Sequence, residues 1–167
     1  MENEIQIDLP FIQTQANENS EKYKALKKKI LAIPEKEFDA LILPIAERIT
    51  TQVDCTKCGN CCRQLNPPVR EDEILQLAEK KGCSSREFAT QFLHQNPKQD
   101  YFFLKQKPCI FLAETRCTIY ESRPDSCADY PHLQSPGQKF RFGRTIEQAG
   151  TCSIVFHVLE EIYEKLI

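Results

Sequence analysis

Four cysteines within eight residues give the strongest chemical signal in the sequence. Cys55, Cys58, Cys61 and Cys62 stand in the run DCTKCGNCCR. Two cysteines separated by two residues can turn both sulfur atoms onto one ion, and this spacing recurs in zinc and iron–sulfur sites. Gly59 suits such a loop because glycine adopts backbone angles that a side chain would resist. Adjacent cysteines would be strained as a disulfide, so the run predicts metal binding.

A second set of cysteines lies downstream, at Cys109, Cys117, Cys127 and Cys152. Spacings of eight and ten residues within this set are typical of ligands that a fold, rather than one loop, brings together. Cys152 stands where the last helix is predicted to begin, and helix N-termini stabilise thiolates. For each cysteine alone, a small buried hydrophobic residue is the alternative. Together the two sets predict eight metal ligands: Cys55, Cys58, Cys61, Cys62, Cys109, Cys117, Cys127 and Cys152.

The ninth cysteine, Cys83, is predicted to be structural. It directly precedes Ser84, the expected N-cap of a helix, and Phe88 is the residue against which it would pack as a hydrophobic staple. Among the three histidines, only His132, five residues after Cys127, is near enough to a predicted ligand to be considered. The metal centre is therefore expected to consist of cysteines.

Thiolates around a divalent ion carry a net negative charge, which is costly to bury unless cations or N–H donors face it. Lys57, Arg63, Arg116 and Arg123 each lie within a few residues of a predicted ligand. They are candidates for this role, and ordinary surface charge is the alternative.

The composition excludes several other classes of protein. A formal charge of -2 over 167 residues gives no case for a nucleic-acid surface. No apolar run approaches the roughly 20 residues of a membrane helix. The N-terminal run MENEIQIDLP lacks the basic and apolar regions of a signal peptide. A cytoplasmic protein is therefore expected, and clustered cysteines in that reducing compartment more often bind metal than form disulfides.

Residues 1–50 are predicted to form an N-terminal polar segment and a helical hairpin. Residues 1–17 are left without firm structure, and a helix follows from residue 20 to Pro34. The second helix is expected to be kinked or split by Pro44, since proline within a helix costs about 3 kcal/mol.

Residues 51–167 are predicted to form the cysteine-cluster metal-binding domain. Its expected elements are a ligand loop at 54–63, a helix from Glu71 capped by Gly82, a helix begun by the capping box of Ser84 and Glu87, strands at 101–104 and 118–120, a loop at 134–144 leading to the extended piece QKFRF, and a helix from Ser153. The predicted fold class is mainly α with small β strands, irregular near the metal.

The combined cysteine motifs resemble a known family. After C-x2-C-x2-C-C come P-C at 108–109 and R-C-x-I-Y-x-x-R-P-x-x-C-x-x-Y-P at 116–131. This pattern resembles the CxxCxxCC cysteine-cluster proteins, also called YkgJ-like, which are described as zinc- or iron-chelating domains. The resemblance covers residues 51–152 and implies a bacterial-type metal-binding domain with the eight ligands named above. One departure is Ala128, where such proteins often carry a basic residue, so another cation must neutralise the cluster here.

The first functional hypothesis is a metal-binding module that holds zinc or iron. Eight thiolates would complete two tetrahedral zinc sites, which would be structural and would supply folding energy. Three cysteines of the run with a remote fourth also resemble a ferredoxin-type iron–sulfur arrangement. Both centres take thiolate ligands, so zinc and iron–sulfur stay open alternatives.

The sequence leaves three other functions as alternatives. A redox enzyme or electron-transfer protein using an iron–sulfur centre is the main alternative, although the sequence has no nucleotide loop, flavin motif or nucleophile with its base. The question of enzymatic activity therefore stays open. A metal store or chaperone needs a flexible cluster, which the well-patterned helices argue against. A disulfide-rich secreted protein is the least favoured, because no signal sequence is seen.

Overall fold

The computed structural model describes residues 5, 7–95 and 100–167. The chain forms two compact units, one made of residues 1–54 with 131–167 and the other of residues 55–130. The fold is mainly helical with a few small antiparallel strands, as predicted. Among the described residues, none of the helices has the length and apolar character that crossing a membrane requires.

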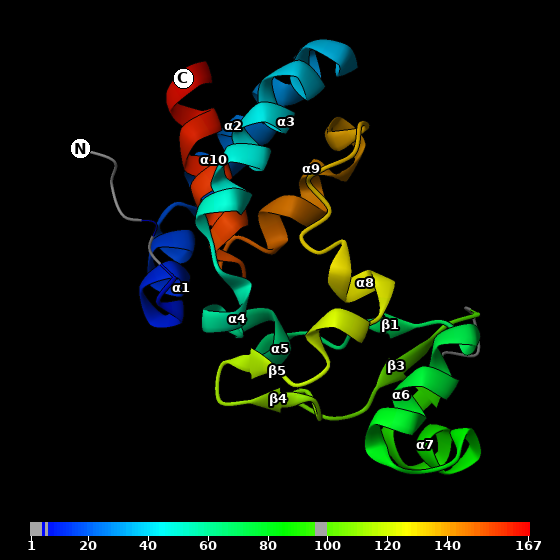
Figure 1. The fold of residues 1–167 in the computed structure, drawn as a ribbon. Helices are drawn as coiled ribbons and strands as arrows, with labels where there is room; N and C mark the ends of the chain where they lie inside the picture. The colour runs from blue at the N-terminus through cyan, green and yellow to red at the C-terminus, as the bar shows by residue number, and fades with distance from the viewer. Residues whose placement is uncertain (1–4, 6, 96–99) are drawn as a thin grey trace. The chain divides into compact units, whose positions relative to one another are not determined.

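The first unit is a helical bundle. Its elements are α1 (Leu9–Glu18), α2 (Ser20–Ala32), α3 (Glu35–Gln52), α9 (Gln138–Glu147) and α10 (Ser153–Leu166). The last helix, α10, packs against the other four and lies alongside α2 and α3 in Figure 1. Both helices of the predicted hairpin are present, and each packs on α9 and α10. Large buried side chains such as Tyr23, Phe38 and Phe142 fill the core.

The N-terminal region differs from the prediction at residues 9–18, and its second helix is continuous. The segment predicted to lack firm structure contains α1, whose first turn is capped by the Asp8 carboxylate accepting a hydrogen bond from the Phe11 N–H. Burial of Ile12 and Ala16 on one face holds this helix in the bundle. The helix α3 is not split at Pro44, which lies on its exposed side.

The prediction of an extended piece at residues 138–142 is also wrong, because these residues form the start of α9. Gln138, Phe142 and Thr145 are buried at helical spacing, but two of the three are polar and hide the stripe in the sequence. The N-terminus of α9 is capped from α3: the Gly137 N–H and the Gln138 N–H both donate to the buried Asp39 carboxylate, at 2.7 and 3.0 Å. Tertiary contacts therefore decide this helix.

The second unit contains short helices and two small sheets. Its helices are α4 (Cys55–Cys58), α5 (Asn60–Gln64), α6 (Ile74–Lys81), α7 (Ser85–Phe92) and α8 (Asp125–Ala128), with 3-10 turns η1 (Glu71–Glu73) and η2 (Tyr120–Ser122). Strands β1 (Pro68–Val69), β3 (Phe102–Leu104) and β2 (Leu93–Gln95) form one antiparallel sheet in that order, and β4 (Leu112–Ala113) pairs with β5 (Arg116–Cys117).

Apolar packing in this unit is centred on α6, α7 and β3. The buried residues are Val69, Ile74, Leu77, Ala78, Phe88, Leu93, Leu104, Phe111 and Ile119. The predicted Gly82 cap and the capping box of Ser84 and Glu87 are both present. Three half-buried cysteines, Cys83, Cys109 and Cys117, pack against this core. Two of the three, Cys109 and Cys117, are predicted ligands.

Two local expectations in this unit were wrong. The run at 54–63 forms the short helices α4 and α5, separated by Gly59 in a left-handed conformation, rather than an irregular loop. Helices of four and five residues are too short to show an apolar period. The strand expected at 118–120 is displaced, since β5 ends at Cys117 and η2 begins at Tyr120. The strand expected at 101–104 is present as β3.

The Asp39 cap can be tested by Asp39→Ala. Because two backbone N–H groups at the start of α9 lose a charged acceptor, the free energy of unfolding is expected to fall by about 1–3 kcal/mol. Urea unfolding followed by far-ultraviolet circular dichroism measures the loss. Glu47→Ala, at an exposed position on the same helix, is the matched control. Equal stability of the two variants would show that the hydrogen bonds of Asp39 do not stabilise α9.

Candidate metal centre

Seven of the eight predicted ligands lie in the second unit, and Cys152 lies in the first. All nine cysteines fall within the described residues, and none of them forms a disulfide. Only Cys55 is exposed; the other predicted ligands are at least partly buried. The sulfur atoms are therefore available as thiols.

Four thiols from separate segments converge in the second unit. Cys62 comes from α5, Cys109 from the segment before β4, Cys117 from β5 and Cys127 from α8. The thiol of Cys127 interacts electrostatically with the other three, and Cys62 interacts with Cys109 and Cys117. We call these residues the thiol cluster: Cys62, Cys109, Cys117 and Cys127.

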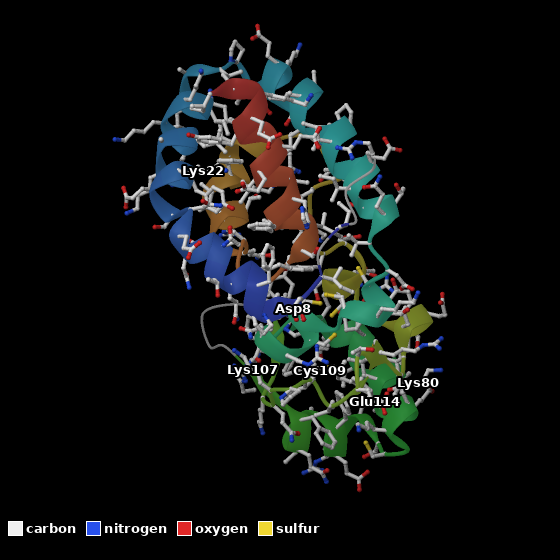
Figure 2. All side chains as sticks on the ribbon, turned by 90° about the vertical axis from the view of Figure 1, so that its left-hand side faces the viewer. Asp8, Lys22, Lys80, Lys107, Cys109 and Glu114 are labelled. Atoms are coloured by element: carbon white, nitrogen blue, oxygen red, sulfur yellow. The ribbon has the colours of Figure 1, made fainter. Side chains whose placement is uncertain are left out.

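Backbone hydrogen bonds connect three members of the thiol cluster. The Cys109 N–H donates to the Cys62 carbonyl at 2.8 Å, and the Leu112 N–H donates to the Cys109 carbonyl at 3.0 Å. Leu112 is in turn the strand partner of Cys117. Figure 2 labels Cys109 within the second unit. These three cysteines are thus set by main-chain contacts, which do not depend on a metal ion.

The fourth member, Cys127, is placed by the anchoring of α8. The Asp125 N–H at the start of this helix donates to the Glu73 carboxylate at 2.8 Å, and the Ser126 hydroxyl donates to the Pro68 carbonyl at 2.6 Å. Arg70 also donates to the Asp125 carboxylate, at 2.7 Å. The helix is therefore fastened to η1 and β1.

Burial keeps these thiols protonated. Burial is the main cause that raises the pKa of Cys127 to about 12, and it also raises the pKa of Cys109 and Cys117. The pKa of Cys62 is raised mainly by a hydrogen bond with the Cys61 thiol, and burial is the second largest cause. At neutral pH the cluster is a group of neutral thiols until a cation replaces their protons.

Among the described residues, Arg63, Arg123 and Lys81 act electrostatically on the thiols of the cluster. Arg63 and Arg123 oppose the rise in the pKa of Cys62, Arg123 does so at Cys117, and Lys81 does so at Cys109. The Arg123 guanidinium lies 3.7 Å from the centre of the Tyr120 ring and donates to the Tyr120 carbonyl. Arg63 and Arg123 were expected from the sequence. Lys81 was missed, because it is 28 residues from Cys109 and only the fold brings it near.

The run Cys55–Cys62 docks against the β4–β5 turn. Arg63 donates from Nη1 to the Cys58 carbonyl at 2.9 Å and from Nη2 to the Glu114 carbonyl at 2.7 Å. A side chain at Gly59 would meet this turn, since a Cβ there would lie 2.7 Å from the Thr115 carbonyl oxygen. Burial is also the main cause that raises the pKa of Cys58.

The thiol cluster does not include Cys152, Cys83 or His132. Cys152 is the buried N-cap residue of α10 in the first unit, as its position in the sequence indicated. Cys83 packs against the apolar core that includes Phe88, in agreement with the staple. His132 belongs to the first unit, whereas the thiol cluster belongs to the second.

The cluster has the chemistry of a metal site without its closed geometry. Within residues 5, 7–95 and 100–167, no three Cys, His, Asp or Glu side chains are arranged so that they could hold a metal ion. The donors nevertheless suit zinc or iron, since thiolates are preferred ligands of both. A bound ion would have to draw the thiols of the cluster closer together.

Comparison with known proteins agrees with the cysteine pattern. A family model described as "CxxCxxCC: Putative zinc- or iron-chelating domain" matches residues 54–153. The chain belongs to this family. The match includes the whole second unit together with α9 and Cys152. Searches of curated proteins and of solved structures gave no match.

The close approach at Gly59 of this CxxCxxCC protein can be tested by Gly59→Ala. Gly82→Ala is the matched control, because Gly82 also has a positive φ but no atom lies within 4 Å of a Cβ there. The control is expected to lose about 1–2 kcal/mol from backbone strain alone. Gly59→Ala should lose more, because the β4–β5 turn must also move. Thermal unfolding of the two variants measures the difference, and equal losses would contradict the close contact.

The raised thiol pKa values predict a pH dependence for the metal-free CxxCxxCC protein. Since the pKa of Cys127 rises from 9.0 to about 12 on folding, its stabilising contribution is complete below pH 9 and is lost between pH 9 and 12. Within that window each such thiol lowers the free energy of unfolding by about 1.4 kcal/mol per pH unit. Urea unfolding of reduced, chelator-treated protein at several pH values measures the slope. Cys127→Ser should give a shallower slope, and an unchanged slope would contradict the assignment.

Proposed function

We propose that the second unit binds a zinc or iron ion through the thiol cluster. The observation that carries this proposal is the convergence of four thiols from four separate segments. Four sulfur donors match the ligand number of tetrahedral zinc and of cysteine-held iron sites. The cluster is the part of the chain where a cation would replace several protons at once.

The state of the thiols favours ligation over thiol-based chemistry. A reactive cysteine needs a lowered pKa and access to solvent, whereas burial raises the pKa of Cys109, Cys117 and Cys127. Such thiols are weak nucleophiles at neutral pH. A bound cation would neutralise the thiolates and so offset the free-energy cost of burying their charge. Because binding would release the thiol protons, the affinity for metal should rise with pH.

The eight predicted ligands are kept as the full proposed set. Cys61 is next to Cys62 and hydrogen bonded to its thiol, so it is the nearest additional donor. Cys55 and Cys58 lie on the same docked run and would serve a second ion or a cluster of ions. Cys152 is proposed as the eighth ligand from its place in the family match.

The proposed role of the ion is to complete the fold of the second unit, because its ligands join segments far apart in sequence. An iron–sulfur centre with electron transfer is the alternative, and it would use the same cysteines. We also propose that the protein is a bacterial, YkgJ-like protein that works in the cytoplasm, where its nine thiols would stay reduced. The proposed partner is the metal ion, with neither nucleic acid nor membrane.

The metal is identified by elemental analysis and a visible spectrum of protein purified without oxygen. A colourless sample with one or two zinc ions per chain would support a structural site. A brown sample with iron and acid-labile sulfide would support the iron–sulfur alternative. Neither metal, with all nine thiols titratable, would refute metal binding.

The ligand assignment predicts that Cys127→Ser lowers both the metal content and the melting temperature. This thiol interacts with the other three members of the thiol cluster, so its loss should leave an incomplete site. Cys83→Ser is the matched control, a half-buried cysteine in the same unit that packs against the apolar core. It should keep its full metal content. Equal metal loss in the two variants would contradict the assignment.

A further inference from the structure

Arg63 joins the two segments on which the thiol cluster depends. One segment is the run Cys55–Cys62, which carries the ligand candidates next to Arg63 in sequence. The other is the β4–β5 turn, which ends two residues before Cys117. The Arg63 guanidinium donates to the Cys58 carbonyl in the first segment and to the Glu114 carbonyl in the second, at 2.9 and 2.7 Å.

The backbone at both ends of this connection is shaped to allow it. Gly59 adopts a left-handed conformation that ends α4 and lets the run approach the turn. Glu114, which is labelled in Figure 2, has a φ of 55°, a conformation that residues other than glycine rarely adopt. The Thr115 hydroxyl adds a third contact by donating to the Thr56 carbonyl at 3.4 Å. Arg63 and Thr115 therefore both contribute side-chain hydrogen bonds to the docked arrangement, and the two bonds of Arg63 are shorter than that of Thr115.

The position of the run has a direct effect on the thiol cluster. The Cys62 carbonyl accepts a hydrogen bond from the Cys109 N–H, and Cys62 is the residue that immediately precedes Arg63. A shift of the run away from the β4–β5 turn would separate Cys62 from Cys117 and strain the bond to Cys109. The geometry of the ligands thus depends on a contact made by a residue that has no metal-binding group of its own.

From this geometry we propose that Arg63 is a positioning residue of the metal site. Its planar guanidinium bonds two carbonyl groups at once and so sets Cys62 opposite Cys117 before any ion is bound. This inference rests on the proposed function, because it assigns Arg63 a role in the same site. Lysine keeps the positive charge, but its single ammonium does not reproduce the fixed fork of arginine.

The test compares Arg63→Lys and Arg63→Met with Arg86→Met. Arg86 is an exposed arginine on α7 of the same unit. Within the described residues, its side chain takes part in no hydrogen bond or ion pair. The first measurement is the affinity of the reduced protein for Co²⁺, followed by its thiolate-to-cobalt absorption. We expect both Arg63 variants to bind about tenfold or more weakly, because charged hydrogen bonds are lost. Arg86→Met should stay within twofold of the unmodified protein.

The second measurement needs no metal. Hydrogen exchange of the Cys109 amide in the metal-free protein reports directly on its bond to the Cys62 carbonyl. We expect this amide to exchange at least several-fold faster in Arg63→Lys than in the unmodified protein, while amides of α6 keep their rates. This local readout also separates repositioning of the run from a general loss of stability, and it serves if Arg63→Met fails to fold.

The outcomes separate the two proposals. If the unmodified protein binds no Co²⁺, the proposed function fails and the role of Arg63 in a metal site fails with it. If the unmodified protein binds Co²⁺ and Arg63→Lys binds equally well, the proposed function stands and charge alone accounts for Arg63, which overturns the positioning role. Weaker binding with an unchanged Cys109 amide would overturn it too. Weaker binding with faster exchange at that amide supports it.

Discussion

The cost of burying sulfur as an anion is the constraint on which the second unit depends. A buried thiolate without a cation is strongly disfavoured, so a protein that gathers thiols must keep them protonated or supply positive charge. This chain does both. Burial holds the pKa of Cys127 at about 12, and arginine and lysine side chains face the other members of the thiol cluster. The unit is thus stable as neutral thiols and suited to exchange their protons for an ion.

The main chain and the side chains have different parts in this arrangement. Main-chain bonds from Cys109 to Cys62 and from Leu112 to Cys109 fix where the cysteines enter the cluster. The thiol groups themselves are not in metal-binding positions within the described residues. Rotation about side-chain bonds is cheaper than movement of a hydrogen-bonded backbone. A framework whose main chain is already hydrogen bonded therefore leaves the side chains as the groups that an ion would move most easily.

The sequence predicted the elements that local rules control. The cap at Gly82, the box of Ser84 and Glu87 and the last helix from Ser153 follow from short-range hydrogen bonding and a clear apolar period. It failed where distant contacts decide. The helix α9 depends on a carboxylate from Asp39, almost 100 residues earlier, and two of its three buried residues are polar.

The candidate site shows the same division between local and distant information. Cysteine spacing selected the candidate ligands, four of which form the thiol cluster, because adjacent cysteines such as Cys61 and Cys62 are poorly suited to a disulfide. Spacing could not identify which thiols face one another. Cys62 and Cys117 are brought together by a strand pair and by an arginine bridge, and Lys81 reaches Cys109 from the end of a helix. Such contacts have no pattern in the sequence.

The chain order places the cysteine unit inside the helical one. Residues 55–130 leave after α3 and return before α9, and α9 and α10 then complete the bundle begun by α2 and α3. The family match covers residues 54–153 and therefore includes α9. The buried Phe142 of α9 packs against Phe38 of α3, a helix that precedes the matched residues. The bundle has a large apolar core of its own. Both ends of residues 55–130 are thus joined to helices that pack on an apolar core, and closing this segment into a loop reduces its conformational freedom before any ion binds.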